Sequence, residues 1–256
     1  MRFNIDLMKS QLTSNLTNLE IEYFEEIDST NTYLLKRKNF SNKILVIADY
    51  QTAGRGRFNR KWLSDPSKNL MFSIGLTNVH PSDLKKFSFF TPLSIQKAVE
   101  ELLNLELKIK WPNDLIFENK KVCGILIESQ IENNEKAKVV VGIGINVNQT
   151  EFSEELKDKA SSLKIIKGEE INREILLARI LTKFFYYLEN SKNNFDEVYR
   201  SYKEKCVGIG QNISVLFDRE IYSGILLDIN RNGELELLVE DKKLSFKSGE
   251  ITLLKE

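Results

Sequence analysis

The order of strand-like and helix-like segments constrains this chain most. Two apolar, β-branched runs at Lys43–Tyr50 and Asn69–Leu76 predict buried strands. A long helical pattern follows over Ser82–Leu103, and short extended runs separated by turn residues fill Leu107–Val147. A further, mostly helical segment over Ile171–Tyr202 carries one apolar stripe. The chain therefore alternates strand and helix texture over most of its length.

The end of the chain has a different texture. After Gly208 and Gly210 it is all-β, with short strands predicted from Ile213 onward and a type I′ turn at Asn232-Gly233. Short strands on this scale suit a small barrel. We place a domain boundary near Cys206, which gives domains at 1–205 and 206–256.

Composition excludes several classes of protein. The 256 residues hold 37 Lys and Arg against 37 Asp and Glu, which argues against a surface that coats nucleic acid or an anionic membrane. The single histidine, His80, disfavours a Ser-His-Asp triad or a multi-histidine metal site. Cys123 and Cys206 form no CxxC pair, and no signal peptide or membrane span is visible. We expect a cytoplasmic protein without membrane contact.

The segment Asp49–Trp62 is the first that carries chemistry. Gly54 and Gly56 let the backbone approach a ligand closely. Four cations alternate with them: Arg55, Arg57, Arg60 and Lys61. Arginine forks and successive backbone N–H groups suit carboxylate and phosphate oxygens. The segment predicts an ordered anion site; the alternatives are a solvated basic loop or an RNA-contacting patch.

The second segment is KIKWPNDLIFENKKVCGILIE, Lys108–Glu128. Pro112 interrupts the extended run, so Lys110, Asn113 and Asp114 are expected at a sharp bend, where they could hold a phosphate and a divalent metal. The alternative is a packed corner in which Asp114 caps its own turn. Lys121 opens the next strand and is either a ligand contact or simply solvated.

The third segment is VVVGIGINVN, Val139–Asn148. Gly142 and Gly144 leave one face of a strand bare, which permits flat packing against a ring or another backbone. No third glycine and no helix follow, so a dinucleotide-binding fingerprint is rejected. Asn146 and Asn148 would read a base edge or line a solvated face.

Together the three segments resemble one family. GRGRFNRKW, KWPND followed by KKVCGILIE, and GIGINVN, in this order and spacing, resemble a biotin protein ligase. Ser29-Thr30-Asn31 matches that family's STN segment, and the closing SGILLDINRNGELEL and GEITLL resemble its C-terminal barrel. The resemblance covers nearly the whole chain from about Tyr23.

The resemblance implies both a fold and a reaction. The fold is α+β, a mixed sheet flanked by helices as in biotin and lipoate ligases, followed by a small SH3-like β-barrel. The reaction uses ATP and Mg²⁺ to adenylate biotin and then transfers biotin to a lysine of a biotin carboxyl carrier protein. The resemblance is compatible with either a monomer or a homodimer. The reaction needs no covalent enzyme nucleophile, because ATP supplies the leaving group.

The resemblance also implies site residues. The family's biotin contacts map onto Ser29, Thr30, Asn31, Gln51, Arg55, Gly56, Arg57 and Lys121. For ATP the candidates are Gly54, Arg57, Arg60, Trp62, Lys110, Asn113, Gly142, Gly144 and Asn146. Lys121 and Arg57 would act where negative charge accumulates, and Trp62 would either cover the adenine or pack in the core. Asp114 is an indirect candidate for the metal.

Two departures and three rival functions remain. Asn59 stands where the family has glycine, and Phe58 stands where it is often polar or basic; asparagine tolerates a positive φ better than most residues. Only some 22 residues precede the match, so we expect a monofunctional enzyme without DNA binding. The rivals are a lipoate protein ligase, an RNA-binding module and a regulatory homologue that binds biotin without turnover.

Overall fold

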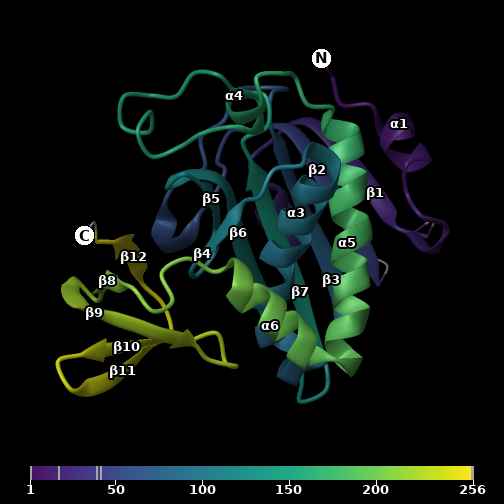
Figure 1. The fold of residues 1–256 in the computed structure, drawn as a ribbon. Helices are drawn as coiled ribbons and strands as arrows, with labels where there is room; N and C mark the ends of the chain where they lie inside the picture. Colours follow the sequence, from purple (N-terminus) through teal and green to yellow (C-terminus); the bar gives the residue numbers. More distant parts are fainter. Residues whose placement is uncertain (1, 17, 39, 41, 255–256) are drawn as a thin grey trace.

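The strands of this protein form two separate sheets, described by a computed structural model over residues 2–16, 18–38, 40 and 42–254 (Figure 1). Of Asn15 and Asn59 only the backbone is described. The larger sheet has the order β1-β2-β3-β7-β6-β5-β4, and only β1 and β2 run parallel. Its strands are β1 (Glu20–Ile27), β2 (Lys43–Gln51), β3 (Leu70–Val79), β4 (Lys108–Lys110), β5 (Asp114–Phe117), β6 (Lys120–Ile131) and β7 (Ala137–Ile145).

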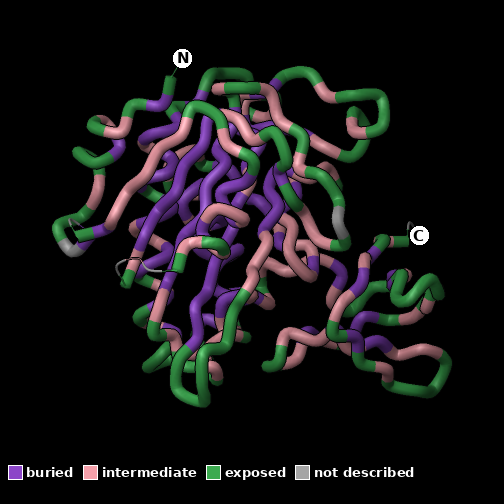
Figure 2. Tube along the Cα trace, turned by 180° about the vertical axis from the view of Figure 1, so that it is seen from behind, coloured by how far each residue is buried: buried purple, intermediate pink, exposed green. Residues whose placement is uncertain are grey.

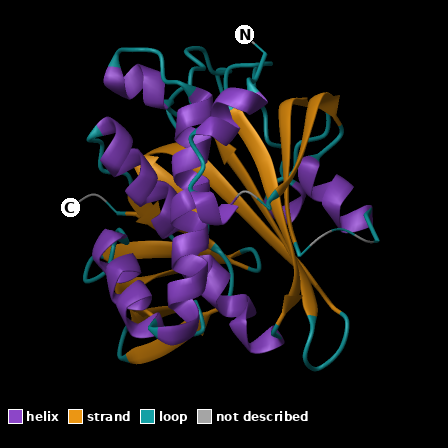
Figure 3. Cartoon of the chain, turned by 90° about the vertical axis from the view of Figure 1, so that its right-hand side faces the viewer, coloured by secondary structure: helices purple, strands orange, loops and turns teal. Residues whose placement is uncertain are grey.

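Helices cover both faces of this sheet (Figure 3). The long α3 and α5 pack together on one face, and the short α2 lies against β2, β3 and β7. The helices are α1 (Ile5–Ser10), α2 (Thr30–Lys36), α3 (Phe87–Leu103), α4 (Leu163–Lys167), α5 (Arg173–Asn193) and α6 (Phe195–Lys205), with 3-10 turns at Ser14–Leu16, Arg57–Asn59 and Pro81–Lys86. The predicted α+β class with a mixed sheet is confirmed. Across the described residues no helix has the length and apolar character needed to span a membrane.

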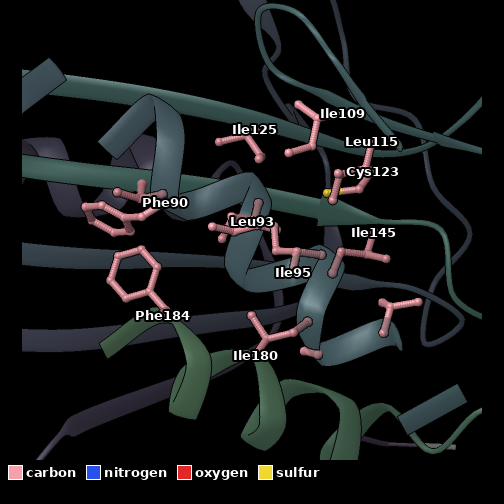
Figure 4. Packing of buried hydrophobic residues seen from close by; sticks show 14 of the residues in the cluster. Phe90, Leu93, Ile95, Ile109, Leu115, Cys123, Ile125, Ile145, Ile180 and Phe184 are labelled. Carbon is pink, nitrogen blue, oxygen red and sulfur yellow. The ribbon is translucent and has the colours of Figure 1, made fainter. Parts of the chain in front are cut away.

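The main core lies between the sheet and the α3–α5 layer. Buried side chains from α3 and α5, such as Phe90 and Phe184, belong to the same hydrophobic cluster as Cys123, Ile125 and Ile145 from the sheet (Figure 4). The central strands form a continuous buried band (Figure 2). Since strand side chains alternate between faces, Gly124 and Leu126 of β6 and Val140, Gly142 and Gly144 of β7 lie on the other face, toward α2. That face carries the glycines.

The smaller sheet has the order β11-β10-β9-β8-β12 and is antiparallel throughout. Its strands are β8 (Asn212–Phe217), β9 (Glu220–Ile229), β10 (Leu235–Val239), β11 (Lys242–Phe246) and β12 (Glu250–Leu253). Five short antiparallel strands agree with the predicted SH3-like fold. The indole N–H of Trp111 donates to the carbonyl of Gly233 at 2.9 Å and so ties this sheet to the larger one. The division at 205/206 stays a prediction.

The segment 171–202 is mostly helical, as predicted, but the backbone of Asn194 (φ −141°, ψ 64°) leaves the helical region and divides it into α5 and α6. One local prediction was wrong. The turn at Asn232-Gly233 is not type I′, because only Gly233 has a positive φ. The Asn230 side chain accepts from the backbone N–H groups of Asn232 and Glu234 and stabilises a different turn.

Candidate active site

A cavity of about 460 Å³ opens on the α2 face of the larger sheet. It gathers every site residue predicted from the sequence except Gly54: Ser29, Thr30, Asn31, Gln51, Arg55, Gly56, Arg57, Arg60, Trp62, Lys110, Asn113, Asp114, Lys121, Gly142, Gly144 and Asn146. Gly54 borders a neighbouring hollow on the other side of the loop. A Cβ at Gly54 would lie 2.7 Å from the backbone oxygen of Trp62. The absence of a side chain at Gly54 therefore lets the two ends of the loop pack together.

Two paired glycines form one part of the cavity floor. Gly124 of β6 lies opposite Gly144 of β7 in the antiparallel register. A Cβ at Gly144 would lie 2.4 Å from the Trp62 ring, and one at Gly124 would lie 2.9 Å from it. The indole therefore rests flat on bare backbone, and its buried N–H has no hydrogen-bond partner among the described residues. Packing of Trp62 in the core is ruled out; its contact with an adenine stays a prediction.

The neighbouring row of the floor holds a buried amide. Ser29 caps α2, and the next helix residues place the Asn31 side chain over Gly142, where a Cβ would lie 2.1 Å from its Oδ1. Ser73 of β3, opposite Gly142, donates to Asn31 Oδ1 at 2.5 Å. The backbone N–H of Thr30 donates to Gln51 Oε1 at 2.8 Å. These polar groups are pre-arranged by mutual hydrogen bonds at one end of the cavity.

The basic loop is an ordered turn in this structure. The backbone N–H of Trp62 donates to the carbonyl of Gly54 at 3.0 Å, and that of Gly56 donates to the carbonyl of Arg60 at 2.7 Å. At the tip, Phe58 takes the left-handed conformation (φ 54°), which is uncommon for an aromatic residue, and its side chain is 62% exposed. The strained residue of the loop is therefore Phe58. The side chain of Asn59 lies outside the described part of the structure.

Carboxylates from distant segments neutralise some of the loop cations. Arg55 pairs with Glu128 at 2.7 Å and Arg60 pairs with Glu250 of β12. Arg57, in contrast, has no described carboxylate within salt-bridge distance and donates to Asn113 Oδ1 at 3.4 Å. Burial lowers the pKa of Arg57 from its ordinary value. Asp114 and Glu250 act on this charge only from beyond salt-bridge distance. A partly buried guanidinium without a direct ion pair suits the oxygens of an anionic ligand.

The two interpretations of the WPND bend apply to different residues. Trp111 is 2% exposed and forms the packed corner. Asn113 is anchored to β6, because its Nδ2 donates to the Ile125 carbonyl at 2.8 Å, while Lys110 and Asp114 line the cavity. The bend thus presents polar groups from a rigid corner.

Lys121 lies beside Asp114, with 2.7 Å between Nζ and Oδ1, and 5.7 Å from the centre of the Trp62 ring. Its backbone is fixed on both sides by the segment that follows β7: its N–H donates to the Lys159 carbonyl at 2.7 Å, and its carbonyl accepts from Ser161 at 2.9 Å. The ammonium group is therefore held at the cavity wall by both its backbone and its ion pair.

The two asparagines after β7 have different roles. Asn146 is 4% exposed, lines the cavity and donates from Nδ2 to the Ser161 carbonyl at 3.1 Å. Asn148 exchanges two hydrogen bonds with the backbone of Ile171, each 2.9 Å long. Its side chain fixes the backbone just before α5. It therefore neither reads a base edge nor lines a solvated face.

Sequence reasoning missed several residues of the cavity wall. They come from the segment after β7, from the smaller sheet and from β6: Phe152, Leu156, Lys159, Ala160, Gly249, Glu250, Ile251 and Leu126. Residues 146–162 form a long connection without regular strand or helix, and such connections in compact domains are commonly functional. That length was the available signal.

Cysteine and clustered metal chemistry find no support in the site. Burial raises the pKa of the Cys206 thiol to about 12 and raises that of Cys123 further. Among the described residues no group of three His, Cys, Asp or Glu side chains is placed to hold a metal ion. Cations, amides and bare backbone line the cavity instead, and cations of this kind suit the oxygens of an anionic ligand.

Comparison with known proteins identifies the family. The sequence profile of the biotin/lipoate A/B protein ligase family matches residues 23–146. The chain is 32% identical over 248 residues to the bifunctional ligase/repressor BirA of Bacillus subtilis, covering 94% of this chain and 76% of the relative. It is 27% identical over 245 residues to the biotin–[acetyl-CoA-carboxylase] ligase of Mycobacterium tuberculosis, covering 92% and 90%. The chain belongs to the biotin/lipoate A/B protein ligase family.

A solved structure extends the likeness to the whole fold. Biotin protein ligase from Aquifex aeolicus in complex with biotin and ATP superposes with a TM-score of 0.79 at 33% identity, over 93% of this chain and 99% of that one. Both sheets therefore lie within the shared fold.

Proposed function

We infer that this protein is an ATP-dependent biotin protein ligase. It adenylates biotin to biotinyl-5′-AMP and transfers biotin to a lysine of a biotin carboxyl carrier protein. The observation that carries this is the cavity in which Arg57, Lys110 and Lys121 converge over a glycine floor. The similarity to a ligase crystallised with biotin and ATP supports biotin as the acid. Two of the three relatives reported above are named for biotin and none for lipoate, so lipoate is not favoured as the substrate.

We assign the first step to the cations. A biotin carboxylate oxygen attacks the α-phosphorus of ATP, the bond to the β-phosphate oxygen breaks, and pyrophosphate leaves. Lys121 and Arg57 stabilise the charge that gathers on the carboxylate and α-phosphate. Two unit charges about 4 Å apart at an effective dielectric near 20 interact by roughly 4 kcal/mol, which is large if directed at the transition state. Lys110 and Arg60 would contact the other phosphates.

In the second step the carrier lysine amine attacks the acyl carbon of the mixed anhydride, and AMP leaves. The enzyme's contribution is to hold the anhydride and exclude water. We assign the biotin ring to the end of the cavity with Ser29, Thr30, Asn31 and Gln51, and the adenine to the region of Trp62 and Asn146.

The cavity offers the carboxylate of Asp114, near which a magnesium ion could be held. Asp114 supplies one hard carboxylate oxygen beside Lys121, and Mg²⁺ typically takes few protein ligands and several from phosphates and water. When bound, the ion would neutralise phosphate charge, with Asp114 as an indirect contact through water.

The RNA-binding alternative is disfavoured by the charge pairing. Arg55 and Arg60 face carboxylates and Arg57 lines the cavity, so the loop does not present a free basic stripe.

The proposed function is tested by exchange of labelled pyrophosphate into ATP, with biotin and lipoate supplied in parallel reactions. We expect pyrophosphate exchange when biotin is supplied and none when lipoate is supplied. Exchange with lipoate alone would overturn the substrate, and binding of biotin without exchange would favour the regulatory homologue.

A further inference from the structure

Glu128 ends the KKVCGILIE segment and was given no role among the predicted site residues; it contacts two side chains that line the cavity. It follows Gly124 and Leu126 on the same face of β6, because alternate strand residues share a face. Its side chain is only 24% exposed. Each carboxylate oxygen has its own partner: Oε1 accepts from Arg55 Nη2 at 2.7 Å, and Oε2 accepts from Asn31 Nδ2 at 2.9 Å.

Both partners belong to the ligand-facing machinery but come from different parts of the chain. Asn31 is in the first turn of α2, and Arg55 is in the basic loop. Arg55 also donates to Thr32 Oγ1 at 3.3 Å, so the loop is fastened to α2 as well as to β6. Glu128 thus joins a helix, a loop and a strand at one point.

The Asn31 amide cannot easily find another arrangement. Its Oδ1 accepts from Ser73 Oγ at 2.5 Å, and its Nδ2 also donates to the Leu126 carbonyl at 3.2 Å. Reversing the amide would place its oxygen against two acceptors, the Leu126 carbonyl and Glu128 Oε2, and would lose both of those hydrogen bonds. Glu128 therefore faces two fixed donors and must be an acceptor at both oxygens.

We propose that Glu128 is a positioning residue for biotin, which holds the loop closed through Arg55 and orients the Asn31 amide. This rests on the proposed function. A carboxylate is required because glutamine offers one acceptor oxygen, so Glu128→Gln must face either Arg55 or Asn31 with an N–H group. The change keeps the size of the side chain and removes one hydrogen bond together with the charge.

The test compares Glu128→Gln with Glu101→Gln, a control carboxylate that pairs with Lys183 between α3 and α5. In biotin-dependent pyrophosphate exchange we expect Glu128→Gln to raise the KM for biotin about tenfold with kcat within twofold, and Glu101→Gln to change neither. Adding Arg55→Ala to Glu128→Gln should raise KM less than Arg55→Ala does in the wild type, because the two residues act as a unit.

A second readout needs no substrate. Trypsin should cut the ligand-free Glu128→Gln protein within residues 55–61 at least threefold faster than the wild type or Glu101→Gln. An unchanged biotin KM in the folded variant, fully independent effects in the double variant, or an unchanged cleavage rate would overturn the role of Glu128. Absence of exchange in the wild type would instead overturn the proposed function, and the cleavage comparison would still decide the loop contact.

Discussion

The tightest contact in the cavity floor gives the most demanding prediction, on Gly142→Ala. The added Cβ would lie 2.1, 2.6 and 2.8 Å from the Oδ1, Cγ and Nδ2 atoms of Asn31, whereas ordinary contacts begin at about 3.4 Å. The whole amide must therefore move by more than 1 Å, and the buried hydrogen bonds from Ser73 and to Glu128 must break.

The cost follows from two contributions. Overpacking in a closed site costs about 1–3 kcal/mol, and each lost hydrogen bond to a buried partner about 1 kcal/mol. We expect Gly142→Ala to lower the free energy of unfolding by about 3 kcal/mol. In an Asn31→Ala background the amide is already gone, so the same change should cost less than about 0.5 kcal/mol.

Urea unfolding of the wild type, the two single variants and the double variant measures this directly. The coupling between the two positions should be about 2 kcal/mol or more, with the double variant more stable than the two single costs would predict. Equal costs of Gly142→Ala in both backgrounds would refute the assignment of the clash to Asn31. A cost below about 0.5 kcal/mol in the wild type would refute the tightness of the floor itself.

Three further predictions concern single groups. Lys121→Ala should lower biotin-dependent pyrophosphate exchange at least a hundredfold. Because the ion pair with Asp114 is partly exposed, the same change should lower the free energy of unfolding by less than about 1 kcal/mol. Retained exchange would remove Lys121 from the mechanism. Cys123 is buried and its thiol pKa is raised, so it should resist a thiol reagent at pH 8 until urea is added; rapid labelling of Cys123 in the native protein would contradict its burial. Burial first, then the hydrogen bond to Asp49, raises the pKa of Tyr23 to about 12. Tyr23→Phe should cost about 1 kcal/mol at neutral pH, and its disadvantage in urea unfolding should shrink from pH 10 toward 12, where the wild-type phenol ionises first in the unfolded chain; a constant gap would count against this.

The elements that could be predicted are those whose signal is local. The apolar run at 43–50 became β2 (Lys43–Gln51), and the helical pattern at 82–103 became a 3-10 turn followed by α3. The break at Asn194 was missed because no proline or glycine marks it and the apolar stripe runs close to it on both sides. Side-chain hydrogen bonds that reshape a turn, as at Asn230, leave no periodic trace in a sequence.

In the site, residue types could be predicted and their partners could not. Glycines and arginines in a short loop favour an anion site but do not by themselves exclude a solvated basic loop. Which carboxylate faces each arginine depends on the register of strands far along the chain, as the 73-residue separation between Arg55 and Glu128 illustrates. A register slip of one residue would turn Glu128 toward α3 and leave the loop without its partner.

The uneven pairing of cations with carboxylates explains how a chain with no net charge can form a cationic site. Three carboxylates from three strands, Glu128, Glu250 and Asp114, pair with Arg55, Arg60 and Lys121. Arg57 is left without a described carboxylate, and burial works against its charge. An anionic ligand restores at that point the favourable interactions that the folded chain does not supply. The surrounding pairs fix the geometry of the loop, so Arg57 stands beside Lys110 as a cation of the cavity wall that no described salt bridge occupies.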